Sequence, residues 1–125
     1  MVTLQMKFVV SAENRHAFEE MIANIYAPAL SRQEGFVNHR LMRQWTEAER
    51  AAIQATAGDQ YDYHLEFTFA TEEQRLRWAS STGHDVAFAA ADGLADAIVH
   101  NGYDLVLDST LPADQTAAPG QTSQL

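Results

Sequence analysis

The residues most able to do chemistry lie together in one stretch, RWASSTGHDVAFAAAD, residues 77 to 92. His84 follows shortly after Thr82, a residue type that caps helices, so we expect its imidazole in the first turn of a helix. The positive end of the helix dipole favours the neutral ring, which can accept a proton. The stretch therefore predicts a base, close to Trp78, that could remove a proton from a phenol or an activated C–H group.

Aromatic side chains around such a base would form the pocket that a flat, apolar substrate requires. His84 and Phe88 fall on one side of the expected helix because they are four residues apart. A structural interpretation also fits, with a capping histidine, a core or interface tryptophan, and tyrosines that continue an apolar strand face. The candidate catalytic residues are His84, Trp78 and Tyr63, and the candidate substrate-binding residues are Phe88, Tyr61 and Asp92.

Composition narrows the classes of function. The chain has 125 residues, which suits one domain, and its net charge of −9 disfavours contact with nucleic acid or an anionic membrane. It has no cysteine, and its five histidines show no His-x-His or His-x-x-x-His spacing, so we expect no metal site. The N-terminus lacks a signal-peptide pattern, and no run approaches roughly 18 apolar residues, so we expect a cytoplasmic protein.

Apolar alternation and capping signals divide the chain into elements. Pro28 removes one hydrogen bond from the first helix, so we expect a kink or a looser last turn there. Thr46 with Glu49 forms a capping box that starts a short inserted helix, and Thr82 with Asp85 opens a second piece of the last helix. Strand, helix, strand, short helix, strand, helix and strand are expected over about 2–10, 12–32, 36–45, 46–58, 61–69, 71–100 and 103–108.

This order predicts an α+β fold, a ferredoxin-like βαββαβ antiparallel sheet with helices on one face. The domain covers residues 1–109, and 110–125, TLPADQTAAPGQTSQL, has no apolar periodicity and is expected to be a disordered tail. The last helix would turn its small residues to the sheet, namely Val86, Ala90, Gly93, Leu94, Ala97 and Ile98.

The other face of the sheet would have no helices over it. It would carry Val9, Leu41 or Met42, Trp45 and Val106 among polar residues. Such a face is too apolar to stay in contact with water, so we expect a homodimer in which two sheets pack face to face, a dimeric α+β barrel.

Several sequence features resemble the antibiotic biosynthesis monooxygenase superfamily of dimeric α+β barrels. They are the turn EGF at residues 34 to 36, the aromatic strand YHLEFTF, the helix start TEEQRLRW, and a histidine one to two turns after that tryptophan. The resemblance covers residues 2 to 108. It implies the same fold, and membership of a group that includes oxygenases acting on phenols, anthrones or quinols without metal or organic cofactor, heme-degrading enzymes, and proteins without known activity. The resemblance to the oxygenases implies that no cofactor is needed.

The resemblance carries over only in part. The heme-degrading branch has an asparagine on the first strand and a histidine about ten residues after the helix tryptophan, whereas here that position is Phe88. The quinone-forming oxygenases have an asparagine and a tryptophan near the end of the third strand, where this chain has Leu65 or Glu66 and Phe69 or Ala70. Neither set is present.

Three functions follow from these observations. The first is a cofactor-independent monooxygenase or related small-molecule enzyme acting on an aromatic, quinol or polyketide-like compound. The alternatives are a non-catalytic dimeric module that binds a small apolar ligand or assembles, and a heme-binding or heme-degrading protein. A cavity between helices and sheet, ringed by Trp78, Tyr63 and His84, would favour the first, and a filled core would favour the second.

Overall fold

A four-stranded antiparallel sheet forms the centre of the molecule. The computed structural model describes residues 1–54 and 58–112, so the end of the insertion and residues 113–125 of the expected tail lie outside the described residues. The strands lie in the order β2-β3-β1-β4. Their bounds are β1 Val2–Val9, β2 Phe36–Arg43, β3 Tyr63–Phe69 and β4 Ala97–Asp104.

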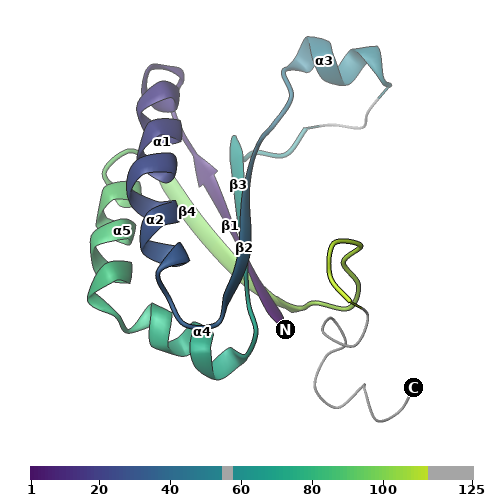
Figure 1. Cartoon of the computed structure of the whole chain (residues 1–125). Coiled ribbons are helices and arrows are strands. Elements are labelled where there is room, and N and C mark those ends of the chain that lie inside the picture. The colour runs from purple at the N-terminus through teal and green to yellow at the C-terminus, as the bar shows by residue number, and fades with distance from the viewer. Residues whose placement is uncertain (55–57, 113–125) are drawn as a thin grey trace.

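The helices α1, α2, α4 and α5 all lie on one side of this sheet (Figure 1). This arrangement confirms the expected ferredoxin-like α+β fold. The helical elements are the 3-10 turn η1 Ala12–Asn14, α1 Arg15–Met21, the π-helical turn η2 Ile22–Tyr26, α2 Ala27–Ser31, α3 Glu47–Ala52, α4 Glu72–Ala79 and α5 Thr82–Asp92.

The first helix widens just before Pro28. Proline has no backbone N–H to donate into the helix, and the turn before it becomes π-helical, with the Ala27 N–H donating to the Ile22 carbonyl. The expected loosening is therefore confirmed as one wide turn. Its last residue, Tyr26, is buried, and its hydroxyl donates to Met6 Sδ on β1 at 3.3 Å.

The core lies between the sheet and the helical layer. Alternate side chains of β1 and β3 face the helices, and each fully buried large apolar side chain contributes about 1.5–3 kcal/mol to stability. The largest buried side chains are Phe8, Phe18, Tyr26, Leu30, Tyr63, Leu65, Phe67, Phe69 and Trp78.

The last helix is shorter than expected. It ends at Asp92, and residues expected in the helix as far as His100 instead belong to β4, whose Ala97 pairs with Val9. Long-range pairing with β1 determines this boundary, which local helix signals do not contain. The helix also starts one residue earlier than expected, because Ser81 is the cap that accepts from the His84 N–H.

The buried face of α5 also differs from the expectation. Ala87 and Ala91 are fully buried, whereas Val86 is 65% exposed, and Ala97 and Ile98 are not in the helix at all. Two alanines let α5 approach the π-helical turn and α2 closely, so they carry the close packing that was expected of other small residues.

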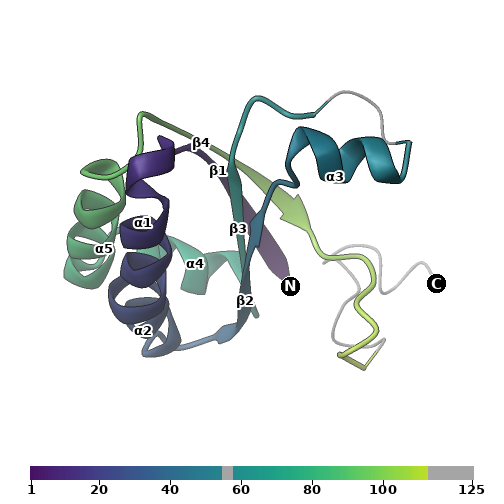
Figure 2. The ribbon, with the colours of Figure 1, turned by 90° about the horizontal axis from the view of Figure 1, so that it is seen from above.

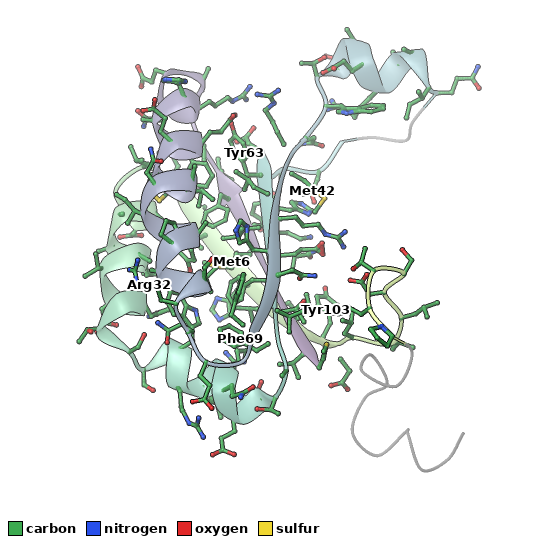
Figure 3. All side chains as sticks on the ribbon, viewed as in Figure 1. Met6, Arg32, Met42, Tyr63, Phe69 and Tyr103 are labelled. Atoms are coloured by element: carbon green, nitrogen blue, oxygen red, sulfur yellow. The ribbon has the colours of Figure 1, made fainter. Side chains whose placement is uncertain are left out.

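The two faces of β2 are partly reassigned. A bulge between Phe36 and Asn38 shifts the register, and Leu41 then pairs with Leu65 on the helix side of the sheet. Met42 lies on the open side and is 41% exposed. Figure 3 shows Met42 and Tyr103 pointing away from the helices and Met6 pointing toward them.

Two segments project on the open side of the sheet. The inserted helix α3 begins with the expected capping box, in which Glu49 N–H donates to Thr46 Oγ1 and the Thr46 N–H donates to Glu49 Oε1. Figure 2 shows α3 and the segment after β4 on the side of the sheet opposite α1 and α5. Their exposed apolar residues include Trp45, Ile53, Val106 and Leu107.

Gly35 connects α2 to β2 with a backbone angle that disfavours any other residue. Its φ is +84°, and an added Cβ would meet the side chain of Gln74. Gly35→Ala should lower the free energy of unfolding by about 1–2 kcal/mol in chemical denaturation. Gly102→Ala is the control, because a Cβ there meets only Leu4 Cδ1, at 3.9 Å. Equal losses in both variants would contradict the assignment.

Candidate functional site

A cavity of about 330 Å³ lies between the sheet and helices α4 and α5. Apart from Arg75, His84 and His100, its lining is apolar or aromatic. The apolar walls come from β1, the π-helical turn, β3, α4 and α5, and they include Leu4, Met6, Tyr26, Phe67, Trp78 and Phe88. Such a space suits a flat aromatic molecule that is held mainly by contact with ring faces.

Trp78 is the central aromatic side chain of this cavity. It is 1% exposed, and its ring lies edge-on to Tyr26, Phe67 and His84, with centroid separations of 6.0, 6.5 and 5.3 Å. Edge-to-face contacts of this kind hold aromatic rings at defined angles. The tryptophan therefore fixes one wall in a single orientation.

His84 lies at the rim of the cavity, where its side chain is 26% exposed. Ser81 caps the helix below it, and its ring stacks on Phe88 at 5.8 Å. The ring Nδ1 lies 3.4 Å from Asp85 Oδ1, which favours the tautomer with the proton on Nδ1. Nε2 is then a free acceptor, since it has no hydrogen-bond partner among the described residues.

Tyr26 supplies a hydroxyl at the base of the cavity. Burial raises the pKa of this phenol well above its ordinary value, so the group stays protonated. Its present acceptor, Met6 Sδ, is a thioether and accepts hydrogen bonds only weakly. The Tyr26 hydroxyl can therefore donate to an oxygen atom of a bound molecule.

The cavity adjoins a wider outer hollow of about 540 Å³ along β4. The two spaces share Leu4, Arg75 and His100, so these three residues mark the boundary between them. Gly102 lines the outer hollow, and because it has no side chain, the passage from the outer hollow to the cavity stays wide.

The structure brings together half of the residues that the sequence proposed for the site. Trp78, His84 and Phe88 all line the cavity. The remaining three, Tyr61, Tyr63 and Asp92, lie outside it.

Tyr63 belongs to the core at the other end of β3. Its ring packs on Phe18 at 4.8 Å, and its hydroxyl donates to Glu19 Oε2, which also accepts from Arg43. In Figure 3, Tyr63 lies near α1 and far along the sheet from Phe69. The cavity is therefore lined by Trp78 and His84 but not by Tyr63, so the prediction of Tyr63 as a residue of the same site is wrong.

Tyr61 and Asp92 also differ from the expected placement. Tyr61 precedes β3 and does not continue its apolar face; Lys7 Nζ lies 5.7 Å from its ring centroid, on the open side of the sheet. Asp92 is exposed at the last residue of α5, where no wall of the cavity is formed. Strand alternation does not extend past the end of a strand, and the helix is too short to carry Asp92 inward.

Sequence reasoning missed seven of the ten lining residues, and three of the seven carry polar groups, Tyr26, Arg75 and His100. Pro28 was the only local signal for Tyr26, since it marks the wide turn that ends there. His100 needed the register of β4, which sets it beside Met6 on the helix side. Arg75 lies in the charged run TEEQRLR, which is typical of a solvated helix face, but its side chain is only 22% exposed.

The described residues hold no group of three or more histidine, aspartate or glutamate side chains placed to bind a metal ion. Within the same residues, no helix has the length and apolar character needed to cross a membrane.

Comparison with known proteins gives structural neighbours but no sequence family. No family model matches the chain, and no curated protein matches it. The solved structure of SnoaB, a cofactor-independent oxygenase from Streptomyces nogalater, has 22% identity and a TM-score of 0.64, over 89% of this chain and 96% of that one.

Two further neighbours have the same fold at lower identity. A Nitrosomonas europaea protein assigned to the antibiotic biosynthesis monooxygenases has 12% identity and a TM-score of 0.60, over 82% of this chain and 96% of that one. A dimeric ferredoxin-like protein of unknown function from Thermobifida fusca has 12% identity and a TM-score of 0.61, over 82% and 88%. The ferredoxin-like α+β fold of the single chain, which the sequence resemblance implied, is confirmed.

Because Tyr63 is buried, the free energy of unfolding should depend on pH in the alkaline range. Desolvation, then its hydrogen bond to Glu19, raises the pKa of the phenol from 10.0 to about 12. The unfolded chain loses this proton more easily, so the free energy of unfolding should fall as the pH rises from 10 to about 12. Denaturant titrations of Tyr63→Phe should show a shallower fall than those of the unsubstituted protein. Parallel curves would contradict the assignment.

Proposed function

We propose that the protein is a cofactor-independent monooxygenase that oxidises an aromatic, quinol or polyketide-like compound in the cavity between its helices and sheet. The observation that carries the proposal is the position of His84, a ring with a free Nε2 at the rim of an aromatic cavity. The fold shared with a cofactor-independent oxygenase supports it.

The proposed reaction needs a base, an apolar site and dioxygen. His84 Nε2 takes a proton from a phenol or an activated CH₂ group of the substrate, leaving an electron-rich anion. That anion reduces dioxygen; one oxygen atom replaces the two hydrogens of the CH₂ group as a carbonyl, and the other leaves as water. The Tyr26 hydroxyl stays protonated and donates a hydrogen bond to the substrate oxygen that gains negative charge.

A non-catalytic ligand-binding module is the second candidate. In the region where the resembled quinone-forming oxygenases have their asparagine and tryptophan, this chain has Leu65 or Glu66 and Phe69 or Ala70. A cavity without that pair could bind an aromatic molecule and leave it unchanged. The two functions share the binding site and differ only in turnover.

Turnover of 1,8-dihydroxyanthrone, followed by oxygen uptake, separates the two. His84→Ala should lower the rate by about a hundredfold or more while the circular dichroism spectrum stays the same. His16→Ala is the matched control, because His16 is 88% exposed and pairs only with Glu20 on the surface of α1. Full activity in His84→Ala would exclude the histidine as the base, and no uptake by the unsubstituted protein would favour the binding module.

We further propose that the protein is a homodimer through the open faces of its sheets, with one domain over residues 1–109 and a tail over 110–125. Met42, Val99 and Tyr103 are 41%, 41% and 50% exposed on that face, and α3 and the segment after β4 project beside it (Figure 2). The Thermobifida fusca neighbour is dimeric. Burying these side chains against a second copy would remove them from water.

A charge on the open face should break this dimer. Met42→Glu and Val99→Glu should each sediment as a monomer, because a carboxylate would be buried without a partner. Leu76→Glu is the matched control, since Leu76 is 53% exposed on α4, on the helix side. A dimer that persists in both open-face variants would contradict the proposed interface.

A further inference from the structure

Apart from the Tyr26 hydroxyl, which burial keeps protonated, every ionisable group in the cavity lining carries nitrogen. These groups are Arg75, His84 and His100, and none of the residues that the structure describes contributes a carboxylate to the lining. The chain as a whole has 17 acidic and 8 basic residues. Because no carboxylate lines this apolar cavity, its arginine and histidines are the groups that an anion would meet there.

We infer that the ligand of this cavity is an aromatic acid, whose rings lie against Trp78 and Phe88 and whose anionic group is bound by Arg75 and His100. The inference rests on the proposed function, because it identifies the class of molecule that the same cavity accepts. It adds a subsite for an organic anion at the boundary between the cavity and the outer hollow.

Arg75 is held ready for such a contact. Its Nε and Nη2 donate to Glu72 at 2.8 and 2.6 Å, which fixes the plane of the guanidinium group. Nη1 has no hydrogen-bond partner in the described part of the chain, so one edge of the fork is available to a ligand. Glu72 and Asp104 line the outer hollow and not the cavity, so both carboxylates lie on the outer side of the boundary that Arg75 marks.

His100 lines the same boundary from the sheet. It pairs with Met6 across β1 and β4, which sets its side chain on the helix side at the edge of the sheet. Both spaces are lined by His100 and by Arg75, one from β4 and the other from α4. An anion between them receives charge-assisted hydrogen bonds from two directions.

The position of the subsite agrees with the depth of the cavity. The inner walls are aromatic and apolar, and a charged group placed there would lose its water without a charged partner. At the boundary the anion keeps contact with the outer hollow, so its loss of hydration is smaller. The acid group therefore determines which end of the ligand enters first, and the oxidisable ring lies inside.

Two fluorescent probes of nearly the same shape test this inference. The anionic probe is 8-anilinonaphthalene-1-sulfonate, and the neutral probe is N-phenyl-1-naphthylamine. The anionic probe should bind about tenfold more tightly, measured by titration calorimetry. Arg75→Met should remove most of this preference while leaving the affinity for the neutral probe unchanged, and Arg75→Lys should retain part of it.

Two controls tie the signal to the subsite. Arg77→Met removes the same charge from the same helix, but Arg77 pairs with Glu73 and Glu34 outside the cavity, so the preference should persist. Gly102→Phe should weaken both probes, because its side chain would narrow the passage where an added Cβ meets only Leu4. A preference lost equally in Arg75→Met and Arg77→Met would show general attraction and overturn the subsite.

The outcomes separate this inference from the proposed function. Equal binding of the two probes would overturn the anion subsite and leave an aromatic-binding cavity in place. Binding of neither probe to the unsubstituted protein would count against the cavity itself, and hence against the proposed function as well. Preference for the neutral probe would reverse the inferred ligand class.

Discussion

The packing of Trp78 against Tyr26 and Phe67 is the contact on which the site depends. These three side chains come from α4, the π-helical turn and β3, so the contact joins the helical layer to the sheet at one point. Elsewhere Ala87 and Ala91 let α5 approach its neighbours closely. The bulky Trp78 holds the layers apart where it packs, whereas Ala87 and Ala91 let them come close. The space left beside the tryptophan is the cavity.

The wide turn before Pro28 makes this contact possible from the side of the first helix. A π-helical turn adds one residue to the ring closed by the backbone hydrogen bond, and it rotates the side chains that follow. Tyr26 ends that turn, and its hydroxyl reaches Met6 on the sheet. The π-helical turn thus places the buried Tyr26 hydroxyl, a hydrogen-bond donor, in the wall of the cavity.

The sequence predicted the features that depend on neighbouring residues. Thr46 and Glu49 cap α3 as expected. Trp78, His84 and Phe88 lie together because Phe88 is only ten positions after Trp78 and the start of α5 lies between them. The ferredoxin-like sheet was predicted from the order of the elements, but two registers between distant strands were not. Residues 97 to 100 were expected in the last helix, but they pair with β1 as part of β4. The bulge in β2 places Leu41 on the helix side of the sheet.

The account makes one central claim, that an aromatic molecule binds beside Trp78. The chain has two tryptophans, and Trp45 is half exposed away from the cavity, so Trp45→Phe leaves Trp78 as the single fluorescent reporter. Titration of that variant with 1,8-dihydroxyanthrone under anaerobic conditions should quench its emission in a saturable way, with one molecule bound per chain. Emission that falls only in proportion to absorbance by the added compound would contradict the claim.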